Sequence, residues 1–122
     1  MLIKRMDDGE HFNMGAGDTR RVIGPHTGAK HLTFNYARFA PNQAFTQHIH
    51  EHSEDLIIVL EGEGVIRLDD EAFPIKAGDI IHVLEGEYHG TVAGPNGLLC
   101  VSVQAPIDHA LYQGGTQPKD RS

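Results

Sequence analysis

Three histidines and an acidic pair are the residues whose types and spacing point to chemistry. His48 and His50 lie two residues apart, Glu54 and Asp55 follow closely, and His89 comes later in the chain. Residues two apart in a β-strand point to the same face, so His48 and His50 can meet one ion. Imidazole and carboxylate ligands suit a divalent ion: manganese, iron(II), nickel, cobalt or zinc. We therefore expect one such ion per chain.

The elements that must position these residues are short strands. With 14 Gly and 6 Pro among short apolar runs, the chain shows no sustained helical periodicity. We predict strands at 32–39, 45–50, 56–60, 65–68, 73–75, 80–84, 90–92 and 98–103. Such spacing leaves no room for helices between strands, so it predicts an all-β fold, an antiparallel sandwich or small barrel. His48 and His50 would share one face of the strand at 45–50.

Length and sequence pattern predict one domain with two distinct ends. The 122 residues suit a single compact core. We expect residues 1–31 to form an N-terminal arm or edge strand packed on the barrel, and residues 32–112 to form the barrel itself. Residues 113–122 are polar, with no apolar side chain, and we expect a flexible tail there.

Charge and cysteine content exclude several classes of protein. The chain has 10 Lys and Arg against 17 Asp and Glu, a net charge of −7, which disfavours binding to nucleic acid or to anionic membranes. Its longest apolar run, 56–60, is far shorter than the ~20 residues that span a bilayer. A single cysteine, Cys100, excludes an intrachain disulfide and a thiolate metal cluster. We expect a cytoplasmic protein with Cys100 as a small buried hydrophobic residue.

Two motifs in this order resemble those of the cupin superfamily, in its small bacterial single-domain form. The first is His48-Ile49-His50, four residues, Asp55, six residues and Gly62. The second is Gly78, five residues, Leu84-Glu85-Gly86, two residues and His89, where Leu84 replaces the usual proline. The resemblance covers about half the chain, roughly residues 41–103. It implies a single-domain antiparallel β jelly-roll barrel, and small members of the family commonly form homodimers.

The resemblance also implies a ligand set of His48, His50, Asp55 and His89. Asp55 stands where the family usually has Glu, and an aspartate reaches about 1.5 Å less far, the length of one carbon–carbon bond. Three alternatives stay open: the strand sits closer to the ion, a water fills the gap, or Glu54 binds instead. Both faces of 56–60 are apolar, so the alternation of side chains does not decide between Asp55 and Glu54.

Other residues are candidates for proton transfer and for substrate binding. Glu54 and His82 are the candidate catalytic acid–base groups near the motifs. Tyr36 and Arg38 share a face of the strand before the first motif, and they could hold a substrate oxyanion if that face lines the barrel.

Four protein ligands leave two positions on an octahedral ion, where a small oxygen-rich molecule can chelate. The resemblance allows dioxygenases, lyases and isomerases, and also sensors and storage proteins. We expect a metal-dependent enzyme that acts on a small oxygen-rich metabolite. The alternative is a non-catalytic module that binds a small molecule or a metal.

Overall fold

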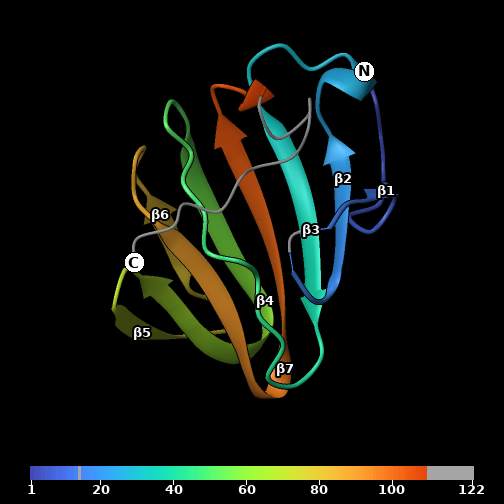
Figure 1. Cartoon of the computed structure of the whole chain (residues 1–122). Coiled ribbons are helices and arrows are strands. Elements are labelled where there is room, and N and C mark those ends of the chain that lie inside the picture. The colour runs from blue at the N-terminus through green and yellow to red at the C-terminus, as the bar shows by residue number, and fades with distance from the viewer. Residues whose placement is uncertain (14, 110–122) are drawn as a thin grey trace.

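The computed structural model describes residues 1–13 and 15–109, which form an antiparallel β fold (Figure 1). Its elements are β1 (Glu10–His11), β2 (Asp18–Ile23), the 3-10 helix η1 (Pro25–Thr27), β3 (Thr33–Phe39), β4 (Glu54–Leu68), β5 (Glu71–Lys76), β6 (Ile80–Val83) and β7 (His89–Ala105). The strands pair in the order β1-β2-β3-β7-β4-β5, and β6 pairs with β4. The predicted all-β class is confirmed.

Two long strands, β4 and β7, replace four of the predicted short ones. The runs predicted at 56–60 and 65–68 are two halves of β4, and those at 90–92 and 98–103 are two halves of β7. The register of β4 against β7 shifts around Gly62, which adopts a positive φ of 82°. Irregularities of this kind bend a strand without ending it. Predicting separate strands was therefore wrong, because the glycines mark bends.

The strand predicted at 45–50 is also wrong as a continuous strand. The segment 44–48 runs beside β7 through two isolated bridges, Ala44 with Val92 and His48 with His89. Beyond His48 the chain leaves β7, and the carbonyl of His50 accepts a hydrogen bond from the Gly86 amide at 2.8 Å. Because of this departure, His50 does not pair with β7, whereas His48 does.

Side-chain alternation along β3, β4 and β7 divides the core between the two faces of the sheet. One apolar cluster contains Phe39, Val59 and Cys100 among its members, and a second contains Val22, Tyr36 and Val101. The face of the first cluster becomes polar toward one end of the strands. There Gln104 of β7 lies between Thr33 of β3 and Asp55 of β4. This polar end of the interior is where the histidines gather.

The N-terminal region enters the sheet through β2, which pairs with β3, and β1 pairs with β2. The division into arm, barrel and tail stays a prediction, and the tail at 113–122 lies outside the described residues, as does the end of the predicted barrel range. Within the described part of the chain, no helix is long and apolar enough to cross a membrane.

Candidate metal centre

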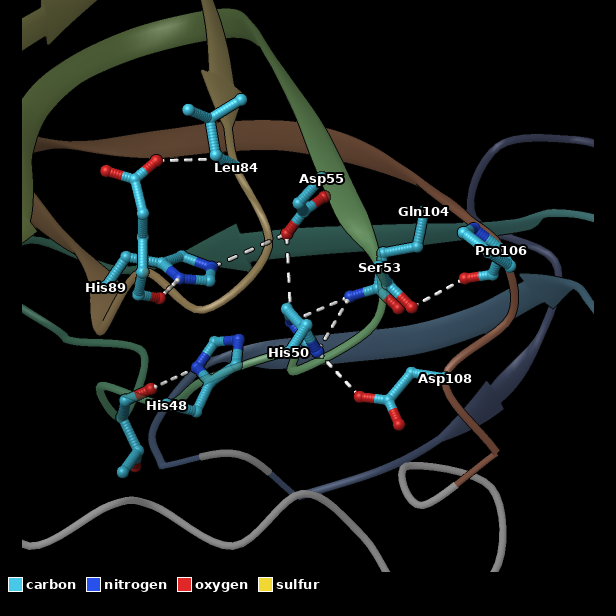
Figure 2. A network of polar contacts seen from close by, with 11 residues as sticks. His48, His50, Ser53, Asp55, Leu84, His89, Gln104, Pro106 and Asp108 are labelled. Carbon is cyan, nitrogen blue, oxygen red and sulfur yellow. Dashed lines mark hydrogen bonds and ion pairs between the residues drawn. The ribbon is translucent and has the colours of Figure 1, made fainter.

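His48, His50 and His89 meet inside the barrel (Figure 2). His48 and His89 are bridge partners that exchange two backbone hydrogen bonds, of 2.8 and 3.0 Å, and their rings lie 4.5 Å apart. The ring of His50 lies 4.6 Å from that of His48. All three residues are buried, and one ring nitrogen from each lies within 4.8 Å of the others. The sequence motifs, 39 residues apart between His50 and His89, thus supply one compact donor set.

Each of the three rings has a fixed acceptor at Nδ1. The pairs are His48 with the Thr46 carbonyl at 2.7 Å, His50 with Asp108 Oδ2 at 2.7 Å, and His89 with the Glu87 carbonyl at 2.8 Å. Carbonyl and carboxylate oxygens accept these hydrogen bonds, so Nδ1 carries the proton on all three rings and Nε2 keeps its lone pair, which on His50 accepts a hydrogen bond from the Gln104 amide. Burial, with smaller contributions from the charges of His89 and His50, lowers the pKa of His48 to about 3. His48 is therefore neutral at pH 7 and ready to bind a metal.

The structure places Asp55, and not Glu54, beside the histidines. Asp55 Oδ2 lies 3.6 Å from Nε2 of His89 and 4.0 Å from Nε2 of His50. The Glu54 side chain is 57% exposed and pairs with His82. Consecutive residues of β4 point to opposite faces, so only one of the two carboxylates can face the interior.

Two buried atoms support an ion at this position. His89 Nε2 and Asp55 Oδ1 have no hydrogen-bond partner among the described residues. Leaving such atoms buried and unpaired is costly, and a divalent cation would satisfy both. Three imidazole nitrogens and a carboxylate fit manganese, iron(II), nickel, cobalt or zinc. The donor set therefore suits the ion that the sequence predicts.

A cavity of about 50 Å³ lies against these donors. Asn35 and Gln104 line it, and both are buried. The Gln104 amide nitrogen donates to His50 Nε2 at 2.8 Å, so this amide would have to turn away for His50 to bind an ion. Asn35 Oδ1 has no partner among the described residues. No lysine or arginine occurs among the described residues that line the cavity. The charge of an anionic ligand would therefore have to be balanced by the ion.

The residues expected to transfer protons lie elsewhere. Glu54 Oε1 and His82 Nε2 are 2.6 Å apart, both side chains are more than half exposed, and neither lines the cavity. His82 of β6 pairs with Leu56 of β4. Its side chain lies next to that of Glu54 on the outer face of the sheet. The structure therefore brings these two residues to each other and not to the histidines.

The residues expected to bind substrate are divided between two places. Tyr36 contributes to the cavity wall, but its hydroxyl accepts a hydrogen bond from Arg38 Nε at 3.0 Å. Arg38 is exposed, pairs with Glu61 at 3.3 Å and lines a separate surface groove. Arg38 is thus directed away from the cavity.

Two polar residues at the centre were not found from the sequence, Gln104 and Asp108. Gln104 lies one position beyond the strand predicted at 98–103, with the same alternation as Cys100, so a longer strand would have revealed it. Asp108 follows the end of β7, and no local pattern connects it with His50.

Comparisons with known proteins agree with this architecture. The cupin domain model matches residues 35–102. The chain is 32% identical over 77 residues to the dimethylsulfoniopropionate lyase DddW of Ruegeria pomeroyi, covering 63% of this chain and 50% of that protein. It spans half or less of the length of the curated relatives it matches.

Solved structures show the same fold. The polyketide cyclase RemF from Streptomyces resistomycificus is 28% identical with a TM-score of 0.72, over 87% of this chain and 79% of that one. A conserved protein with a double-stranded β-helix domain from Klebsiella pneumoniae is 26% identical with a TM-score of 0.73, over 87% and 90%. The likeness confirms the predicted jelly-roll barrel. With the family model matching more than half of its length, this chain belongs to the cupin family.

Proposed function

We propose that this cupin is a metal-dependent enzyme that acts on a small oxygen-rich metabolite. His48, His50, His89 and Asp55 would hold one divalent ion. The observation that carries the proposal is the set of three buried rings, each with Nδ1 engaged and the ligating nitrogens within 4.8 Å of one another. Imidazoles fixed in this way are prepared for metal binding, because their orientation and protonation are already set.

A bound ion would act as a Lewis acid that polarises a substrate oxygen and acidifies a neighbouring hydroxyl or C–H group. The chain's own residues would orient the substrate, limit the entry of water and accept a proton. The Asn35 and Gln104 amides line the cavity and can orient substrate oxygens by hydrogen bonds. Phe45 and Ile57 form apolar wall around the same space and limit the entry of water. If Oδ1 of Asp55 binds the ion, Oδ2 is the carboxylate oxygen of the cavity that is left to accept a proton.

The relatives support chemistry of the lyase or cyclase type. One similar protein is a dimethylsulfoniopropionate lyase and another is a polyketide cyclase. Isomerase chemistry, and dioxygenase chemistry with iron(II), are compatible with the same donor set. Only part of each curated relative is matched, so the substrate is proposed from the cavity and not from the relatives. It is a molecule that chelates the ion through two oxygens and carries no more negative charge than the ion can balance.

A second candidate function is a non-catalytic module that binds a small molecule or a metal. The position of the expected acid–base residues favours it, since Glu54 and His82 lie outside the cavity. Cys100 lines the cavity but offers no thiolate, because burial, with a smaller contribution from Asp55, raises its pKa to about 12. Binding without turnover would follow if Asp55 cannot move a proton while it holds the ion.

Metal analysis and a substrate screen test the proposal. Protein purified without chelator should contain one divalent ion per chain, and His48→Ala, His50→Ala and His89→Ala should each reduce occupancy sharply. The wild type loaded with iron, manganese, nickel or zinc would then be offered small carbonyl compounds and hydroxy acids. Oxygen uptake with iron alone indicates a dioxygenase, and anaerobic turnover with zinc indicates a lyase or isomerase. No turnover with any metal, together with tight binding of an unchanged ligand, leaves the binding module; no metal binding refutes both.

A further inference from the structure

The three histidines differ in how their Nδ1 atoms are held. For His48 and His89 the acceptor is a backbone carbonyl two residues earlier, so the local chain fixes the ring. For His50 the acceptor is the side chain of Asp108, 58 residues away. The orientation of His50 therefore depends on where the segment after β7 lies.

That segment is fastened beside the centre. Ser53 Oγ donates to the Pro106 carbonyl at 2.6 Å (Figure 2). Both Ser53 and Ile107 are buried. These contacts place Asp108 beside His50. Only 14% of the Asp108 side chain and 2% of the His50 side chain are exposed. A carboxylate that accepts an N–H bond at 2.7 Å in such surroundings is a strong partner.

We propose that Asp108 is a positioning residue of the metal centre. It holds His50 with the proton on Nδ1, directs Nε2 into the cavity and increases the electron donation of that nitrogen to an ion. The inference rests on the proposed function, in which His50 is a ligand. Coupling is reciprocal: if the docked segment favours the ion, the ion favours docking of residues 105–109.

Metal affinity tests the inference. Titration with zinc or cobalt(II) would compare the wild type with Asp108→Asn and Asp108→Ala. Loss of a supporting carboxylate typically weakens metal binding about 10- to 100-fold, and we expect Asp108→Ala to fall in this range. Asp108→Asn should lose less, since its amide oxygen still accepts the Nδ1 proton without the charge.

Glu54→Gln is the matched control. It removes one negative charge from another carboxylate–histidine pair, of 2.6 Å, that lies on the surface outside the cavity. Its metal affinity should stay within about twofold of the wild type, because exposed ion pairs contribute little. An equal loss in Glu54→Gln and Asp108→Asn would overturn the inference, since it would reveal a general effect of charge.

Two further measurements separate positioning from a merely structural role. Nitrogen NMR of the His50 ring, without added metal, should show the Nδ1–H form in the wild type and a mixture of both forms in Asp108→Ala, where the Gln104 amide is free to turn its oxygen toward Nε2. Hydrogen exchange at residues 105–109 should slow when zinc is added to the wild type, and should not slow in Asp108→Ala. Thermal unfolding without metal shows whether each variant folds. If Asp108→Ala does not fold, Asp108→Asn takes its place in the NMR and hydrogen-exchange comparisons.

The outcomes distinguish the two proposals. Wild-type affinity in both Asp108 variants, or an unchanged His50 ring form, would overturn the role of Asp108. If no protein binds an ion, the proposed function fails, while the NMR comparison still decides whether Asp108 sets the protonation of His50.

Discussion

At the residue scale, the two adjacent carboxylates are expected to behave differently. Asp55 lies beside His50 and His89, whereas Glu54 pairs with His82 on the surface. Asp55→Ala should reduce metal affinity by at least about tenfold, more than Glu54→Ala, because it removes a donor from the ion. Titration of both variants with cobalt(II) measures the difference. The reverse order would make Glu54 the ligand and shift the motif by one residue.

Cys100 provides a second residue-level prediction. Burial disfavours the charged thiolate and raises the pKa of this thiol to about 12. At pH 8 the thiol therefore stays protonated, and a thiol reagent should modify it only after unfolding. Mass spectrometry after labelling, with and without urea, measures this. Fast labelling of the folded protein at pH 8 would contradict the buried position.

At the element scale, the pairing of β4 with β7 depends on close approach at Gly64. A Cβ there would lie 2.1 Å from the Val92 carbonyl oxygen, which belongs to the backbone and cannot turn aside. Gly64→Ala should therefore push the strands apart and cost about 1–3 kcal/mol or more in the free energy of unfolding. Denaturant titration measures the loss.

Gly78→Ala is the comparison for this prediction. Gly78 has open space around its Cβ position, but it adopts a positive φ of 97°. Its substitution should cost only the conformational penalty, about 1–2 kcal/mol. If Gly78→Ala destabilised the protein more than Gly64→Ala, the close contact of β4 with β7 would not be the limiting feature.

At the scale of the whole molecule, stability should follow metal occupancy and pH. An ion that binds only the folded state, at a hundredfold excess over its Kd, adds about 2.7 kcal/mol to the free energy of unfolding. The chelated protein should also lose stability as the pH falls from about 6.5 toward about 3. Across this range the unfolded chain protonates His48 while the folded chain, with a pKa of about 3, does not.

Thermal unfolding with zinc, with chelator and at pH 7 and 5 measures both effects. His48→Gln should flatten the acid dependence of the chelated protein, since it removes the buried group. Equal unfolding temperatures with zinc and with chelator would contradict a site that exists only in the folded chain.

A homodimer is the second whole-molecule prediction. The outer surface near β6 carries exposed Leu56 and Ile80, which are 37% and 64% exposed. Burial of such residues against a second copy would be favourable. Light scattering at micromolar concentration should give twice the mass of one chain, and Ile80→Asp should shift the mass toward a single chain. A single-chain mass for the wild type would contradict the prediction.

The sequence by itself determined the all-β class, the family and the three histidines, because these depend on local patterns. Strand-length apolar runs, turn residues and the spacing of two motifs are all visible without knowing which segments pair. The same local view could not see that β4 and β7 are continuous, since a glycine at a bend and a glycine at a strand end look alike.

Only the tertiary structure decided which side chains face the three-histidine cluster. The run after Asp55 is apolar on both faces, so nothing in its sequence says which of Asp55 and Glu54 points inward; the pairing of β4 with β6 and β7 does. The same pairing turns Glu54 and His82 toward solvent. Asp108 reaches His50 across 58 residues. A contact of this kind arises from packing of distant segments, and no periodicity along the chain encodes it.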